Sequence, residues 1–230
     1  MPTETRTLRV MPIAISAKPI PGSDKVTLVI LLLVSLFLTT TVNRWAGVAL
    51  VSVHSDAGWI ASAAIPSCIV ILSLYFCSAS RSGLRWPRLN PPDRRFVISL
   101  SALWLGLWLS ASVAVAFAMG YWPTYARGWP AILAFLAFGP IGEELWFRGL
   151  IFERARRLWA NSARPAIWIS TVAFSLHHVQ LHRLPLDGAA LAQIGFTLPM
   201  GLVFAQLRER SGSLLPALLL HVATNLPFIF

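Results

Sequence analysis

Apolar stretches separated by short polar segments recur along the whole chain. Several are long enough for an α-helix to cross roughly 30 Å of hydrocarbon, which takes about 17 to 25 residues at about 1.5 Å per residue. The stretch 45–57 fits an outer loop, an interfacial segment or part of a broken helix, and it carries no identifiable chemistry. Taken in order, the pattern predicts an all-α, polytopic bundle of about seven transmembrane helices, near residues 26–43, 58–80, 96–120, 130–152, 165–181, 189–207 and 213–230.

The composition agrees with a bilayer environment. Of the 230 residues, 56% are hydrophobic and only 12% are charged, whereas a soluble domain has about 25% charged residues. The formal net charge of +10 would suit nucleic-acid binding. The basic residues, however, lie in short clusters between the apolar stretches and not along one polar face. We therefore expect the lipid bilayer, and no nucleic acid, as a partner.

The clusters of lysine and arginine predict the orientation, because cytoplasmic loops hold an excess of these residues. From the N-terminus onward, the eight segments outside the predicted spans contain four, one, five, one, four, one, two and none of them. The alternation predicts a cytoplasmic N-terminus, with residues 1–25 as a cytoplasmic segment, and an outward C-terminus. We expect an integral multi-pass protein of the bacterial inner membrane.

Polar residues inside the later spans carry the candidate chemistry. An ionisable group at the centre of a membrane helix costs at least about 2.5–3.5 kcal/mol, so each one requires a partner or a function. The interiors of the first three predicted spans contain none. The fourth span contains Glu143, Glu144 and Arg148, the fifth contains His177 and His178, and the seventh contains His221 and Asn225.

Helical spacing assigns different surroundings to the two glutamates. Glu144 and Arg148 are four residues apart, so they share a helix face and can form an ion pair that offsets the burial of both. Glu143 points about 100° away and lacks that partner. Pro140 cannot donate a backbone hydrogen bond, and it should kink the helix just before the glutamates.

The same spacing recurs in the fifth and seventh spans. The ring of Phe174 can pack beneath the imidazole of His178, four residues later, and fix its position. His177 faces elsewhere and is left out of the predicted site. His221 and Asn225 present an imidazole and an amide donor toward one point, where they could hold an oxyanion. The alternative for this pair is hydrogen bonding between helices, which is common in membranes.

These motifs resemble the CPBP family, the intramembrane glutamic endopeptidases that process CAAX proteins and bacteriocins and include abortive-infection-like proteins. Each motif alone is weak, but three in order on separate spans form a specific signal. The resemblance covers about residues 130–230. The motifs are Glu143-Glu144-x-x-x-Arg148, Phe174-x-x-x-His178 and His221-x-x-x-Asn225.

The resemblance implies a hydrolase that acts on peptide bonds of a membrane-anchored protein or peptide. Glu143 and His178 would activate a water, and His221 with Asn225 would stabilise the oxyanion. Support would come from Glu144, Arg148 and Phe174. We expect no cofactor and no metal, because an HExxH motif is absent and Arg148 would oppose a dication; zinc held by the glutamates and histidines is the alternative.

The expected organisation is therefore a group of N-terminal membrane spans, residues 26–120, followed by a catalytic membrane core of four helices, residues 121–230. Two other classes of function remain open from the residues. A non-enzymatic immunity or regulatory protein would bind a peptide with the same groups, and a transporter or proton channel would also bury carboxylates and histidines.

Overall fold

The computed structural model describes residues 25–34, 87, 89–120, 132–178 and 188–229. Within these ranges every regular element is a helix, so the all-α prediction is confirmed for the described part of the chain. The predicted second span and the stretch 45–57 lie outside the described residues, and the number of seven spans stays a prediction. In chain order, the described helices are Lys25–Val34, α3 (Pro91–Met119), η1 (Ala134–Phe138), α5 (Gly139–Glu143), η2 (Glu144–Ile151), α6 (Phe152–Leu158), α7 (Ala163–His178), α8 (Gly188–Ser211), α9 (Leu215–Asn225) and η3 (Leu226–Phe228).

Helix α3 has 29 residues, and its ends follow from the sequence. The side chain of Asn90 caps the N-terminus by accepting a hydrogen bond of 2.9 Å from the amide of Asp93. Prolines occupy the first turn, where helical hydrogen bonding needs no N–H. Gly120 ends the helix at φ 72°, a left-handed conformation that glycine adopts without steric cost.

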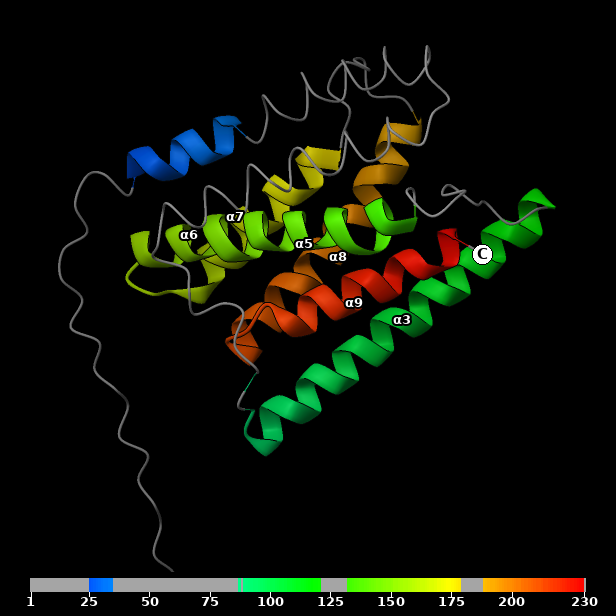
Figure 1. Ribbon diagram of the computed structural model, residues 1–230, viewed down its shortest axis with the longest axis horizontal. Helices are drawn as coiled ribbons and strands as arrows, with labels where there is room; N and C mark the ends of the chain where they lie inside the picture. Colours follow the sequence, from blue (N-terminus) through cyan, green and yellow to red (C-terminus); the bar gives the residue numbers. More distant parts are fainter. Residues whose placement is uncertain (1–24, 35–86, 88, 121–131, 179–187, 230) are drawn as a thin grey trace, which may run out of the picture.

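Two helices, Pro91–Met119 and Ala190–Ser211, are long and apolar enough to cross a membrane, as judged by length and composition. Large apolar side chains are exposed along α3, among them Leu103, Leu107 and Phe117. So much exposed apolar surface is unusual in water. It is the surface expected of a helix that faces lipid, and Figure 1 shows α3 at the edge of the bundle.

The predicted fourth span is a continuous helical segment with two π-helical stretches, η1 and η2, on either side of α5. In a π turn the amide bonds to the carbonyl five residues earlier, which widens the helix, and such turns often occur at functional sites. Pro140 is the second residue of α5, between these two stretches. Where the sequence predicts a kink, the structure therefore has wide turns that change which residues share a face.

The other helices pack around this segment. α7 contacts α6 and α8, and α8 also contacts α3 and α9. Figure 1 shows α9 running between α3 and α5, and it contacts both. Phe147, Phe174 and Phe204 are almost completely buried where η2, α7 and α8 meet. The interior of the bundle therefore lies directly beside the residues of the three motifs.

Helix α9 is shorter than the predicted seventh span, 213–230. It comprises 11 residues, Leu215–Asn225, and continues as the 3₁₀ turn Leu226–Phe228. An α-helix of that length measures about 16 Å, roughly half of the hydrocarbon thickness. Prolines explain where α9 begins and where it ends. Pro216 lies in its first turn, and Pro227 in the 3₁₀ turn has no N–H to continue the α-helix.

One end of the bundle carries a cluster of charges. The positive-charge alternation places the predicted loops 81–95, 153–164 and 208–212 on one side of the membrane, and ion pairs join residues of all three, which lie in α3, α6 and α8. The ion pairs that join them are Arg208 with Glu153, Arg156 with Glu209 at 3.2 Å, and Arg210 with Asp93 at 3.6 Å.

Candidate active site

Glu144 and Arg148 form the ion pair that their spacing predicts. Nη1 of Arg148 lies 3.1 Å from Oε1 of Glu144, and both side chains are almost completely buried. Nη2 of Arg148 also donates to the backbone carbonyl of Gly201 at 3.2 Å. The guanidinium carbon lies 4.1 Å from the ring centroid of Phe174 and 5.3 Å from that of Phe204. The positive charge is therefore held by a carboxylate, a carbonyl and two aromatic faces.

The close approach of α7 and α8 makes the Gly201 contact possible. A Cβ atom at Gly201 would lie 3.3 Å from side-chain atoms of both Phe174 and Thr171. Side-chain hydroxyls add hydrogen bonds around the same helices: Ser170 donates to the carbonyl of Phe147 at 2.9 Å, and Ser175 lies 2.9 Å from Thr197 across the α7–α8 contact. The surroundings of Arg148 are therefore tightly packed.

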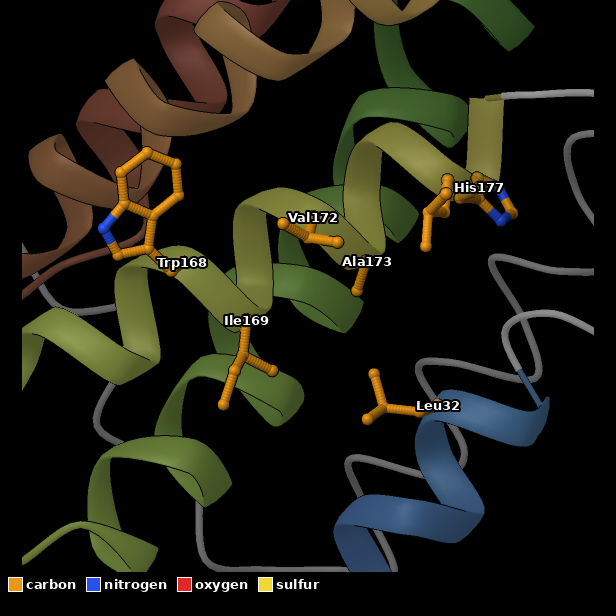
Figure 2. A pocket seen from close by; sticks show the side chains of 7 residues that line it. Leu32, Trp168, Ile169, Val172, Ala173 and His177 are labelled. Carbon is orange, nitrogen blue, oxygen red and sulfur yellow. The ribbon is translucent and has the colours of Figure 1, made fainter. Parts of the chain in front are cut away.

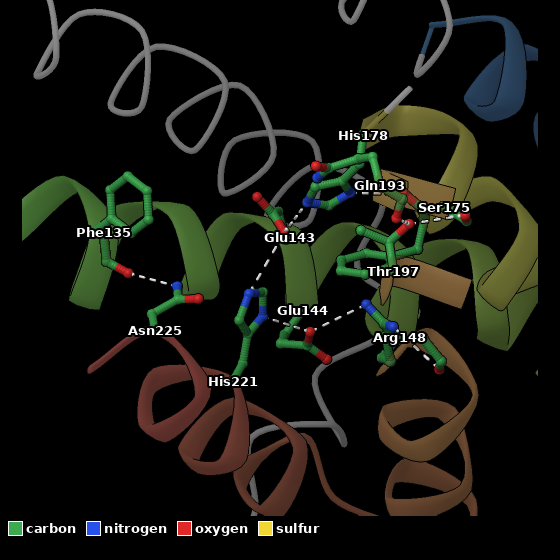
Figure 3. Close-up of polar contacts among 12 residues, drawn as sticks. Phe135, Glu143, Glu144, Arg148, Ser175, His178, Gln193, Thr197, His221 and Asn225 are labelled. Carbon is green, nitrogen blue, oxygen red and sulfur yellow. Dashed lines mark hydrogen bonds and ion pairs between the residues drawn. The ribbon is translucent and has the colours of Figure 1, made fainter. Parts of the chain in front are cut away.

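Glu143 faces two imidazole rings, as Figure 3 shows. Its Oε2 atom lies 3.5 Å from Nε2 of His178 and 3.7 Å from Nε2 of His221. Both distances exceed those of a direct hydrogen bond, and Oε2 is buried without a hydrogen-bond partner in the described structure. The Glu143 side chain as a whole is 25% exposed, whereas that of Glu144 is almost completely buried.

Contacts with Phe174 orient the His178 ring. The two ring centroids are 4.4 Å apart, as the spacing predicts, and Nδ1 of His178 lies 2.8 Å from the carbonyl oxygen of Phe174. Because a carbonyl can only accept, this contact assigns the proton of the neutral ring to Nδ1. Nε2 of His178 is then a hydrogen-bond acceptor that faces Glu143. Two acceptors, this nitrogen and Oε2 of Glu143, therefore lie side by side.

His221 connects the two glutamates. Its Nδ1 atom lies 3.0 Å from Oε1 of Glu144, the oxygen that also accepts a hydrogen bond from Arg148. An ionised Glu144 only accepts hydrogen bonds, so Nδ1 of His221 carries a hydrogen. It follows that Nε2 of His221 can donate toward the Glu143 side only when the ring is protonated. Arg148 balances the negative charge of Glu144, and a charged His221 would balance that of Glu143.

His221 and Asn225 have different partners in the described structure, and the convergence of their donors on one point stays a prediction. His221 faces the glutamates, whereas Nδ2 of Asn225 donates to the carbonyl of Phe135 in η1 at 2.9 Å (Figure 3). The reason lies in η1: a π turn would bond the Phe135 carbonyl to the amide of residue 140, but Pro140 has no N–H. The Asn225 amide supplies a donor at this carbonyl.

His177 has different surroundings. Its ring centroid lies 5.4 Å from that of Phe147, and it lines an apolar cavity of about 410 Å³ between α7 and the helix Lys25–Val34, together with Leu32 and Trp168 (Figure 2). Figure 3 places the motif residues around Glu143 and Glu144 instead. The ring of His177 lies 5.6 Å from that of His178, but it faces the apolar cavity.

The sequence reading missed Gly201, Phe204 and Phe135 as partners of motif residues. Their contributions are backbone carbonyls and an aromatic ring, which carry no ionisable signal in a sequence. As for zinc, the described residues contain no group of three or more histidine, cysteine or acidic side chains that could hold a metal ion.

Residues 125–227 match a family model described as "Type II CAAX prenyl endopeptidase Rce1-like". No curated protein and no solved structure matched the chain. The matched region contains all three motifs and the helices that bring them together. The part of the chain that contains the three motifs is therefore similar to the CPBP family of CAAX-processing proteases.

Proposed function

We propose that this protein is an intramembrane endopeptidase that hydrolyses a peptide bond of a membrane-associated protein or peptide with a water activated by Glu143 and His178. The observation that carries the proposal is the buried Oε2 atom of Glu143, which faces the Nε2 atoms of His178 and His221 at 3.5 and 3.7 Å. The match of residues 125–227 to an endopeptidase family supports this proposal, and the two long apolar helices support a location in the membrane.

The pair of acceptors suits the activation of water. A water between Glu143 and His178 would donate one hydrogen to each, which fixes its oxygen lone pairs toward a substrate carbonyl. As that oxygen bonds to the carbonyl carbon, Glu143 takes a proton and the carbonyl oxygen becomes an oxyanion. The proton then passes to the leaving amine as the carbon–nitrogen bond breaks. No covalent bond to the enzyme forms in this sequence.

The oxyanion needs donors close to Glu143, and we assign His221 to this role. In its protonated form His221 keeps Nδ1–H on Glu144 and offers Nε2–H toward the reacting carbonyl. The amide of Asn225 has two hydrogens and the contact with Phe135 uses one, so the other can add to the oxyanion hole. Glu144 and Arg148 would hold the His221 ring in this orientation.

Metal dependence separates this mechanism from the zinc alternative. Activity of the purified protein should survive a tight chelator that reduces bound metal to zero, because the proposed water is activated by a carboxylate and an imidazole. A zinc peptidase treated in parallel should lose its activity and regain it when zinc is added. Loss of activity on chelation, with recovery on addition of zinc, would support the zinc mechanism instead.

The two adjacent histidines provide a matched pair of variants. His178→Ala should lower the cleavage rate by about 10²- to 10⁴-fold, the usual range for the loss of a general acid or base. His177→Ala should leave the rate roughly unchanged, since His177 lines the apolar cavity and not the carboxylate site. Rates are compared at equal amounts of membrane-inserted protein. Equal losses in the two variants would contradict the assignment of His178.

The substrate that we propose is a chain anchored in the membrane and cut near its C-terminal or transmembrane end. The matched family model names CAAX prenyl endopeptidases, so a lipid-modified C-terminal tail is the first chemistry to test. From the charge alternation we also propose seven spans, a cytoplasmic N-terminus and a site that opens toward the cytoplasm, in the bacterial inner membrane. A reporter fused to Phe230 should then appear outside the cytoplasm.

A comparison of membrane proteomes tests the function directly. Cells that produce the wild type should contain new C-termini that are absent from cells producing equal amounts of Glu143→Gln. Identical sets of termini would contradict an endopeptidase. If the Glu143→Gln form retained the cellular effect of the protein, a peptide-binding immunity or regulatory function would replace the enzymatic one, and ion flux in proteoliposomes would identify a transporter.

A further inference from the structure

Two tryptophans of α3 bind the C-terminal turn of α9. Nε1 of Trp108 donates to the backbone carbonyl of Thr224 at 2.8 Å, and Nε1 of Trp104 donates to the Thr224 hydroxyl at 3.1 Å. The hydroxyl in turn donates to the carbonyl of Leu220 at 2.8 Å. The hydroxyl and the backbone carbonyl of Thr224 therefore both have hydrogen-bond partners.

The end of α9 needs these donors. The last four carbonyls of an α-helix lack partners within the helix, and an unsatisfied carbonyl costs several kcal/mol in hydrocarbon. A 3₁₀ turn after α9 would bond the Thr224 carbonyl to the amide three residues later, but that residue is Pro227, which has no N–H. The indole of Trp108 supplies a donor at this point.

The tryptophan rings are themselves fixed from a third helix. Phe196 of α8 stacks on Trp108, with ring centroids 4.2 Å apart and an angle of 29° between the planes. Its ring lies 6.1 Å from that of Trp104. The indoles are thus held by stacking on α8 while their N–H groups bind α9, which leaves little freedom for the turn that contains Thr224.

We propose that Trp104 and Trp108 are positioning residues that set the orientation of His221 and Asn225 through Thr224. Thr224 is the residue before Asn225 and follows His221 by three positions, which is nearly one helical turn. Both tryptophans lie outside residues 125–227, the part that matches the family model. The inference rests on the proposed function for its effect on catalysis, and it assigns to α3 a role in the site that none of the three motifs contains.

The kinetic test compares Trp108→Phe, which keeps a ring to stack on Phe196 but removes the N–H, with Leu107→Ala, a lipid-facing control on the same helix. We expect Trp108→Phe to lower kcat by on the order of 10- to 100-fold, the cost of small displacements of catalytic groups, with KM and the thermal midpoint roughly unchanged. Leu107→Ala should retain kcat. An unchanged kcat for Trp108→Phe, or a loss that follows a lower thermal midpoint, would overturn the proposal.

A double-mutant cycle tests the route through Thr224. Trp104→Phe should lower kcat in the wild type but have little further effect in Thr224→Val, which already lacks the hydroxyl that Trp104 binds. Losses that simply multiply would mean that Trp104 acts through other contacts and would overturn this part of the proposal.

Hydrogen–deuterium exchange provides a readout that does not depend on catalysis. In purified full-length protein, Trp108→Phe should speed exchange in peptides that cover residues 215–229, and Leu107→Ala should not. Unchanged exchange in these peptides would overturn the positioning role. If the wild type cleaves nothing while the exchange result holds, the endopeptidase proposal fails and the structural link between α3 and α9 stands.

Discussion

Glu143→Gln should lower the rate of peptide cleavage by about 10²- to 10⁴-fold, the usual contribution of a general base. The substitution keeps the shape of the side chain but removes the charge and one acceptor oxygen, so the water can no longer transfer a proton to this position. Since Oε2 has no hydrogen-bond partner among the described residues and the side chain is partly exposed, the fold should tolerate the change. Cleavage of a membrane-anchored peptide is measured by mass spectrometry at equal amounts of folded protein.

Asp93→Asn is the matched control for this experiment. It also exchanges a carboxylate for an amide, but Asp93 lies at the N-terminus of α3, where it pairs with the exposed Arg210. Its cleavage rate should remain close to that of the wild type. Retention of wild-type cleavage by Glu143→Gln would remove Glu143 from the mechanism, and equal losses in both variants would point to a general effect of carboxylate removal.

Arg148→Met should destabilise the protein by about 3–5 kcal/mol, the usual cost of removing one partner of a buried ion pair. Arg148 is fully buried, and its loss removes the cation that balances Glu144, one of the two hydrogen-bond donors to the Glu144 carboxylate and the side-chain donor to the carbonyl of Gly201. The packing on Phe174 is also lost. We expect a lower thermal midpoint in detergent and, because Glu144 holds His221, reduced cleavage by the protein that remains folded.

Two further variants make this prediction specific. Arg95→Met removes an exposed arginine at the start of α3 and should have little effect on the thermal midpoint. The double variant Glu144→Gln/Arg148→Met should recover part of the stability lost in Arg148→Met, because it no longer buries an unpaired carboxylate. If Arg148→Met unfolded at the same temperature as the wild type, the ion pair would have no structural role.

Contacts within one helix could be predicted from the sequence. The Glu144–Arg148 ion pair and the packing of Phe174 on His178 depend only on a separation of four residues, which places side chains on one face. The separation of Glu143 from that pair follows from the same geometry. For this reason the motif residues with local partners were placed correctly.

Contacts between helices could not be predicted in the same way. The amide of Asn225 binds the carbonyl of Phe135, 90 positions earlier, and it does so in a π-helical stretch that the spacing of apolar residues does not reveal. The bonds of Trp104 and Trp108 to Thr224 also join positions more than a hundred residues apart. Such partners depend on how helices pack, and neither tryptophan differs in sequence from an ordinary lipid-facing residue.

Pro227 has a consequence for the order of assembly. Membrane helices are inserted one after another and then associate within the bilayer. Because Pro227 removes a donor from the end of α9 and the indole of Trp108 replaces it, α9 completes its hydrogen bonding only against a helix that lies more than a hundred residues earlier in the chain. The site around His221 would therefore form only after α9 has packed against α3, a step that follows the insertion of both helices.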